Sequence, residues 1–185
     1  GEKVASYIPD DEQGPYAAVR ALLAEGYRQP LCLHLPVGHL ATTRRRQGLV
    51  RACREAGIDP DSLEHAYMAH GDEHYRDIPT ALLARIRNGI PRFDSVICGN
   101  DRIAFMVYQT LLAQGLRIPE DVAVIGYDNM VGIGELFLPP LSTVQLPHYE
   151  IGRLSALHII NGAQHRETTR VESPFLMRDS IARAM

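Results

Sequence analysis

Two short apolar runs in the second half of the chain each end on a polar side chain. Residues 95–98 lead into Asn100, and residues 122–126 lead into Asp128. In parallel sheets ligands bind beyond the carboxyl ends of the strands, and amide and carboxylate groups hold polar ligands by directional hydrogen bonds. The pattern therefore predicts a polar-ligand site at Asn100 and Asp128. Two simpler alternatives stay open, a helix cap for Asn100 and a turn for Asp128.

A run of three arginines, Arg44-Arg45-Arg46, lies in a segment with helical spacing of apolar residues. Such a run is typical of a solvated helix face. One of the three can still turn inward to a ligand, because the guanidinium offers a planar fork of donors to carboxylate, phosphate or paired hydroxyls.

Three histidines, His65, His70 and His74, lie within ten residues and close to Asp72 and Glu73. Histidine and carboxylate side chains are zinc ligands, but this spacing matches no established metal-binding pattern. The segment is predicted to be a solvated loop. We expect neither a metal nor a cofactor.

Enzyme signatures are weak. Cys98 ends a strand before a turn, as some nucleophiles do, but it lacks the expected small flanking residues and an adjacent histidine. The sequence favours a buried structural cysteine. It contains no Gly-x-Ser-x-Gly elbow and no glycine-rich phosphate loop. The protein is predicted not to be an enzyme.

The elements that position these residues alternate along the chain. Helical spacing, capping residues and apolar runs give the following order of expected elements: helix from Pro15 to Gly26, strand 31–35, helix 42–57, strand 64–68, helix including 81–87, strand 95–98, helix from 100 or 101 to 115, strand 122–126, extended 142–144, helix 147–162, strand 170–177. In the helix that includes residues 81–87, Asp72 is the expected cap, Asn88-Gly89 the stop, and Pro79 the cause of a late start or a kink. Apolar strands between amphipathic helices predict an α/β fold. Its parallel sheet is covered by helices on both faces, in three layers.

Composition sets further limits. The chain has 185 residues, 45% of them apolar, and a net charge of −3 from 19 basic and 22 acidic side chains. It is therefore a poor nucleic-acid binder by itself. No apolar run approaches the roughly 20 residues of a membrane span, so we expect no membrane partner. Three widely spaced cysteines favour a reducing compartment, and we expect a cytoplasmic protein. The chain opens on Gly1, so we interpret it as part of a longer protein.

Several segments in order resemble the LacI/GalR family of bacterial transcription regulators. They are residues 97–104 (Ile-Cys-Gly-Asn-Asp-Arg-Ile-Ala), 115–129 (from Gly-Leu-Arg-Ile-Pro-Glu to Gly-Tyr-Asp-Asn), 139–144 (Pro-Pro-Leu-Ser-Thr-Val), 45–49 (Arg-Arg-Gln-Gly-Leu) and 13–27. The likeness extends from about residue 9 to about residue 180.

The resemblance implies a domain organisation. Family members carry an N-terminal helix-turn-helix headpiece and a two-lobed core like that of periplasmic sugar-binding proteins. Residues 10–138 and 168–182 would form the C-terminal lobe, and 1–9 and 139–167 remnants of the N-terminal lobe. The headpiece would be absent from this chain. Operator DNA would be bound only through that headpiece.

The resemblance also implies site residues. Asn100 and Asp128 are the expected contacts to effector hydroxyls, and Arg45 is the third. Asp101 is expected to support Asn100 or to reach the effector itself. Two further positions depart from the family and are expected near the effector. Glu73 stands where an aromatic residue is common, with Tyr75 close by, and Leu146 stands where glutamine is common.

The leading hypothesis is therefore the ligand-sensing and dimerisation core of a regulator, most simply a repressor. Its expected effector is a sugar, a sugar derivative or a nucleoside-like metabolite. The alternative is a periplasmic sugar-binding protein that serves a transporter. We expect a homodimer or a higher homo-oligomer. We also expect the helix at 149–161 to self-associate or to exchange between copies, because most of the lobe that covers it in the family is missing.

Overall fold

A six-stranded sheet forms the centre of the computed structural model, which describes residues 4–130, 132–163 and 165–182. Its strand order is β10-β8-β7-β6-β2-β3. The strands are β2 (Pro30–His34), β3 (Glu64–Tyr67), β6 (Ser95–Cys98), β7 (Ala123–Asp128), β8 (Ser142–Gln145) and β10 (Phe175–Leu176). Neighbours are parallel except β10, which pairs antiparallel with β8. The predicted α/β fold with a mostly parallel sheet is confirmed.

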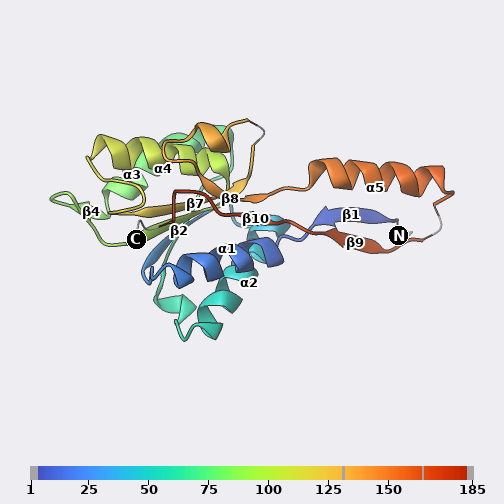
Figure 1. Ribbon diagram of the computed structural model, residues 1–185, viewed down its shortest axis with the longest axis horizontal. Coiled ribbons are helices and arrows are strands. Elements are labelled where there is room, and N and C mark those ends of the chain that lie inside the picture. Colours follow the sequence, from blue (N-terminus) through green and yellow to red (C-terminus); the bar gives the residue numbers. More distant parts are fainter. Residues whose placement is uncertain (1–3, 131, 164, 183–185) are drawn as a thin grey trace.

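Helices cover both faces of this sheet (Figure 1). On one face lie α1 (Gln13–Ala24) and α2 (Leu40–Glu55), and on the other α3 (Ile78–Leu83) and α4 (Asp101–Ala113). Side chains of α3 and α4 pack on Leu31, Leu33, Val96 and Val124, whereas α1 and α2 pack on Cys32, Ile125 and Tyr127. Because neighbouring residues of a strand point to opposite faces, an almost continuous apolar strand contributes side chains to the apolar cores on both faces of the sheet. We call the sheet and these four helices the main lobe.

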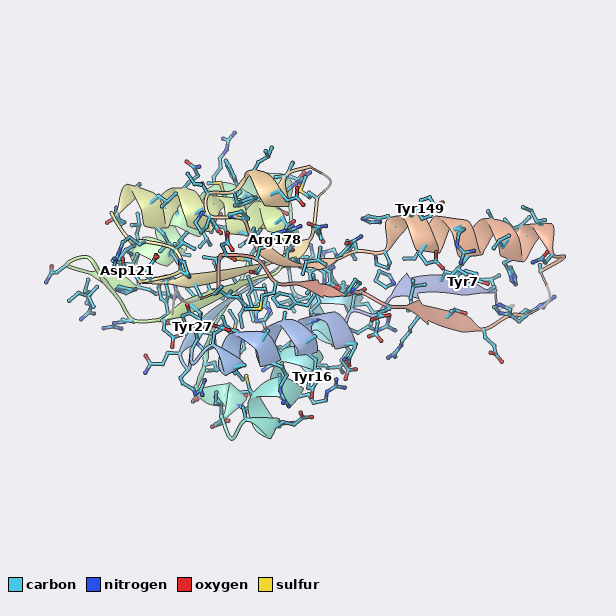
Figure 2. The ribbon with its side chains drawn as sticks, viewed as in Figure 1. Tyr7, Tyr16, Tyr27, Asp121, Tyr149 and Arg178 are labelled. Atoms are coloured by element: carbon cyan, nitrogen blue, oxygen red, sulfur yellow. The ribbon has the colours of Figure 1, made fainter. Side chains whose placement is uncertain are left out.

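A second region extends away from the main lobe (Figure 1). It consists of the parallel pair β1 (Ser6–Pro9) and β9 (Thr168–Val171), with α5 (His148–Ile160) alongside. Tyr7 reaches from β1 toward α5 and meets His158 edge to face at 5.9 Å, while Tyr149 is exposed on α5 (Figure 2). We call this region the arm.

Residues 84–91 correct one prediction. The helix expected to include 81–87 ends at Leu83, and Arg87 lies in β4 (Ile86–Arg87), which pairs antiparallel with β5 (Ile90–Pro91). Asn88 and Gly89 have φ angles of 52° and 76°, so they form the tight turn of this hairpin and do not stop a helix. The late start expected from Pro79 is confirmed, because α3 begins at Ile78 after the 3-10 segment Asp72–Asp77.

Two predicted boundaries fall elsewhere. The excursion expected at 139–167 begins only after Gln145, because Ser142–Gln145 pair with β7 in the main sheet. The single strand expected at 170–177 is two strands, β9 in the arm and β10 in the sheet. The remaining short elements are the 3-10 turns Pro60–Ser62 and Gly134–Leu136. None of the helices described is long and apolar enough to cross a membrane.

Candidate functional site

Arg45 lies at the centre of a polar cluster at the carboxyl ends of the strands. Its Nε donates to Asp11 Oδ1 at 3.1 Å, and one terminal nitrogen donates to the carbonyl oxygen of Gly99 at 2.6 Å. The other terminal nitrogen is 3.9 Å from Asp128 Oδ1. Only 13% of the Arg45 side chain is exposed, so α2 turns this arginine inward while it leaves Arg46 more exposed, at 40%. The inward arginine expected from the run of three is thus Arg45.

Tyr127 and Asp11 hold Arg45 in place. The guanidinium carbon lies 3.5 Å from the centre of the Tyr127 ring, and the Tyr127 hydroxyl donates to Asp11 Oδ1 at 2.9 Å. A guanidinium over an aromatic face is stabilised by the ring quadrupole. Sequence reasoning missed both residues. Asp11 and Tyr127 are 116 positions apart, and no local pattern marks either.

Asn100 uses its amide in two directions. Its Oδ1 accepts the backbone N–H of Ile103 at 2.9 Å and so caps α4, as the simpler alternative foresaw. Its Nδ2 donates to the Tyr75 hydroxyl at 2.6 Å. An amide nitrogen carries two hydrogens, so one remains for a ligand. Tyr75 thereby lies beside Asn100, at the edge of the cluster.

Asp128 has an unusual backbone and an unusual charge environment. Its φ is 113°, a value that side-chain-bearing residues rarely adopt and that often accompanies functional sites. Burial raises the pKa of its carboxyl to about 7. The charges of Asp101 and Asp11 add to the rise, and Arg45 opposes it. A quarter of the side chain remains exposed, so Asp128 presents a carboxyl group to the surface at the strand ends.

The other three predicted positions have different surroundings. Asp101 is 2% exposed, and its carboxylate accepts from the Thr143 hydroxyl and the Met130 N–H. Asp101 therefore anchors the backbone that follows Asp128 through the Met130 N–H. The backbone N–H of Leu146 donates to the Asp128 carbonyl at 3.2 Å, which places Leu146 next to the cluster. Glu73 points outward with 72% of its side chain exposed.

The residues weighed for other chemistry also have clear positions. His74 pairs with Asp77 at 2.7 Å on the surface, and His70 is exposed, as expected of a solvated loop. His65 differs, because it is half-buried against His34. Cys98 is buried, and burial raises the pKa of its thiol, as the structural interpretation of this cysteine expects.

The cluster thus combines a guanidinium, a carboxyl group and an amide at one edge of the sheet. These groups offer both donors and acceptors to a ligand with several hydroxyls. A site built from them discriminates against analogues that lack a hydroxyl, because its own polar groups would then stay unpaired.

Comparison with known proteins agrees with this geometry. A family profile described as "Periplasmic binding proteins and sugar binding domain of LacI family" matches residues 2–180. The chain belongs to this family. The sucrose operon repressor of Escherichia coli is 55% identical over 175 residues, which are 95% of this chain and 53% of the repressor. The HTH-type transcriptional repressor PurR of Vibrio vulnificus is 32% identical over 180 residues, 94% of this chain and 52% of that protein.

Solved structures show the same LacI-family core. A LacI family transcriptional regulator from Enterococcus faecium, with bound ribose, superposes with a TM-score of 0.80 at 29% identity, over 95% of this chain and 64% of that one. The resemblance to a LacI/GalR effector-binding core is therefore confirmed. The chain spans about half the length of the curated relatives it matches.

Proposed function

We propose that this chain is the sugar-sensing core of a LacI-family repressor and that its effector is sucrose or a sugar derived from it. The observation that carries the proposal is the cluster of Arg45, Asn100 and Asp128 at the strand ends. The 55% identity to a sucrose operon repressor over nearly the whole chain supports the choice of sugar.

Each group has a role in this proposal. The Asp128 carboxylate accepts from sugar hydroxyls, and the free hydrogen of the Asn100 amide donates to a sugar oxygen. The guanidinium of Arg45 keeps Asp128 partly ionised and holds the Gly99 turn in place. Tyr75 presents its ring and hydroxyl at the rim. The protein binds the sugar and catalyses no reaction.

Effector binding acts through two lobes. The main lobe, built from residues 10–145 and 172–182, is the proposed C-terminal lobe, and the arm is the part of the chain that belongs to the N-terminal lobe. A sugar between the lobes would shift the population of their arrangements. It would change DNA affinity only by as much as it prefers one arrangement. Operator DNA in the cytoplasm would be bound by a headpiece that precedes the two lobes.

We also propose that the intact protein is a homodimer that uses the outer side of α4. Four large apolar side chains are exposed there and on the adjoining loop: Phe105, Leu112, Leu136 and Leu138. The Phe105 and Phe137 rings lie 6.2 Å apart, which joins the helix and the loop into one patch. Exposed apolar patches of this kind mark contacts between proteins.

The periplasmic transport alternative is less well supported. The matching profile describes periplasmic binding proteins as well, so the fold alone does not separate the two functions. The high identity to a repressor favours regulation. In the transport alternative the protein would bind the sugar, and its DNA affinity would not depend on that binding.

An amide NMR titration of the chain with sucrose, glucose and fructose tests the proposal. We expect saturable shifts near Gly99, Asn100 and Asp128. In Asp128→Asn, which tolerates the positive φ, affinity should fall about 10- to 100-fold, since a hydrogen bond to a charged group contributes about 1.5–3 kcal/mol. Asp121→Asn is the matched control, because Asp121 pairs with Arg117 before the other end of β7. Absence of binding by all three sugars, or full affinity in Asp128→Asn, would overturn the proposal.

A further inference from the structure

A block of four side chains lies on one face of the two strands at the β3 edge of the sheet. Cys32 and His34 are two residues apart in β2, so they point to the same face. In the parallel register His65 lies opposite Cys32, and Tyr67 lies opposite His34. Cys32 packs beneath α2 against Leu49 and Ala52, so the block extends from the core to the sheet edge.

The two histidines are in direct contact. His34 Nε2 and His65 Nδ1 are 2.8 Å apart, and the rings stack at 5.1 Å between centroids. Tyr67 also stacks on His34, at 4.7 Å between ring centroids. Contacts with the rings of His65 and Tyr67 therefore restrict the orientation of His34.

The hydrogen-bond pattern fixes which nitrogen of His65 carries a lone pair. His65 Nε2 lies 3.1 Å from the carbonyl oxygen of Pro60, and a carbonyl can only accept. His65 therefore carries its hydrogen on Nε2 and turns an unprotonated Nδ1 toward His34. An imidazole whose second nitrogen donates to a backbone carbonyl is the usual form of a metal-ligating histidine, since that bond sets both the tautomer and the ring orientation.

The three ligand atoms are close enough to share one ion. The Cys32 sulfur, a His34 nitrogen and a His65 nitrogen all lie within 4.8 Å of one another. Zn–N and Zn–S bonds of about 2.0 and 2.3 Å in a tetrahedral site separate two nitrogen ligands by about 3.3 Å. A small rotation of the half-buried His65 ring away from His34 would give that spacing. The set of one sulfur and two imidazole ligands suits Zn²⁺ among the abundant divalent ions, and excludes Mg²⁺ and Ca²⁺, which prefer oxygen.

We propose that Cys32, His34 and His65 form a Zn²⁺ site that ties the edge strand β3 to β2. On binding, the Cys32 thiol releases its proton to solvent as the Zn–S bond forms. The hydrogen of His34 moves from Nε2 to Nδ1, so that Nε2 binds the ion, and His65 binds through Nδ1. The fourth position stays open, as in zinc sites with three protein ligands. The site shares no ligand with the sugar cluster of Arg45, Asn100 and Asp128, although His34 and Arg45 line a common cavity.

Cobalt substitution tests the site. The reduced chain, stripped of metal with a chelator, is titrated with Co²⁺, whose tetrahedral complexes absorb in the visible and whose thiolate complexes add a near-ultraviolet charge-transfer band. We expect one equivalent to give both bands and Zn²⁺ to abolish them. His65→Asn should weaken binding by at least about tenfold, and Cys32→Ser should remove the charge-transfer band. Circular dichroism verifies that each variant is folded, and His65→Asn keeps the test decisive should the buried Cys32→Ser not fold.

The control is the double variant His158→Asn, His165→Asn. These two rings also contact each other, at 4.5 Å, but they lie in the arm. The proposal expects unchanged cobalt binding in this variant. It is overturned if no thiolate band forms, if His65→Asn binds as the parent does, or if the arm variant loses the ion.

Discussion

Helices α4 and α5 are each 13 residues long, yet their environments are opposite. Helix α4 buries seven side chains, among them Ile103, Val107 and Leu111, between the sheet and α3. Helix α5 buries none, although it carries Leu157, Ile159 and Ile160. An apolar residue stabilises a helix only where a second layer covers it. The main lobe supplies that layer for α4. For α5 the described contacts come from β1 and from the rings of Tyr7 and His165, which meet His158 of the helix itself.

The same contrast holds for charge. The Arg45–Asp11 ion pair of the main lobe is nearly buried and joined to a ring and a backbone carbonyl, whereas other pairs of that lobe, such as Arg102–Asp72, are exposed. The arm pair Arg153–Glu150 lies on the surface of one helix. Burial is therefore concentrated in the main lobe, whereas the arm leaves the apolar side chains of α5 exposed. Four experiments test this difference, in order of expected effect.

Truncation of a core side chain should separate the two regions most clearly. Leu111→Ala in α4 is expected to lower the free energy of unfolding by about 2–5 kcal/mol, because it leaves a cavity in a fully buried core. Ile159→Ala in α5, whose side chain is 74% exposed, should change it by less than about 0.5 kcal/mol. Urea unfolding followed by circular dichroism measures both. Equal losses would mean that α5 is packed in solution.

Titration should distinguish the carboxyl groups of the two regions. Burial raises the pKa of Asp128 to about 7, whereas the hydrogen bond from Arg153 lowers the pKa of Glu150 in the arm. Between the pKa of an unfolded aspartate, near 4, and about 7, the native state binds the extra proton, so the free energy of unfolding falls as pH rises. Side-chain NMR gives the two pKa values, and Asp128→Asn should flatten the fall. An Asp128 pKa near 4 would refute the burial described here.

Removal of an arginine should have unequal effects as well. Arg45→Ala leaves the Asp11 carboxylate without its cation and is expected to lower the free energy of unfolding by about 1.5–3 kcal/mol. Arg153→Ala in the arm should cause no measurable change, because exposed ion pairs contribute little. Thermal and urea unfolding of both variants check this. If Arg45→Ala is as stable as the parent, the contacts of Arg45 with Asp11 and Gly99 do not stabilise the fold.

A substitution in the arm should disturb self-association less than a substitution in the patch beside α4. Leu138→Asp, in the exposed patch beside α4, is expected to weaken dimerisation about tenfold or more, since burial of a leucine contributes about 1.5–3 kcal/mol. Ile160→Asp in α5 tests the self-association or exchange expected for this helix and should have the smaller effect. Sedimentation velocity over a range of concentrations compares them. If only Ile160→Asp loses the dimer, the main contact between the two copies lies in the arm.

The sequence predicts most of the main lobe because its signals there are local. Apolar runs define β6 and β7, and Asn100 caps α4 as its position indicates. The Asn88-Gly89 hairpin was missed because the same pair also suits a helix end.

In the site, Asn100 and Asp128 follow from the rule for strand ends, and Arg45 from the family resemblance. Asp11 and Tyr127 could not be foreseen, because only folding brings residues 116 positions apart into contact. Nor could the contact of His34 with His65, since it depends on the register of two strands.

A crystal structure of the chain with sucrose tests the central claim most directly. The account predicts sugar density at the carboxyl ends of β6 and β7, with a hydroxyl at hydrogen-bond distance from the Asp128 carboxylate and an oxygen within reach of the Asn100 amide. Sugar bound elsewhere, with Arg45, Asn100 and Asp128 untouched, would contradict it.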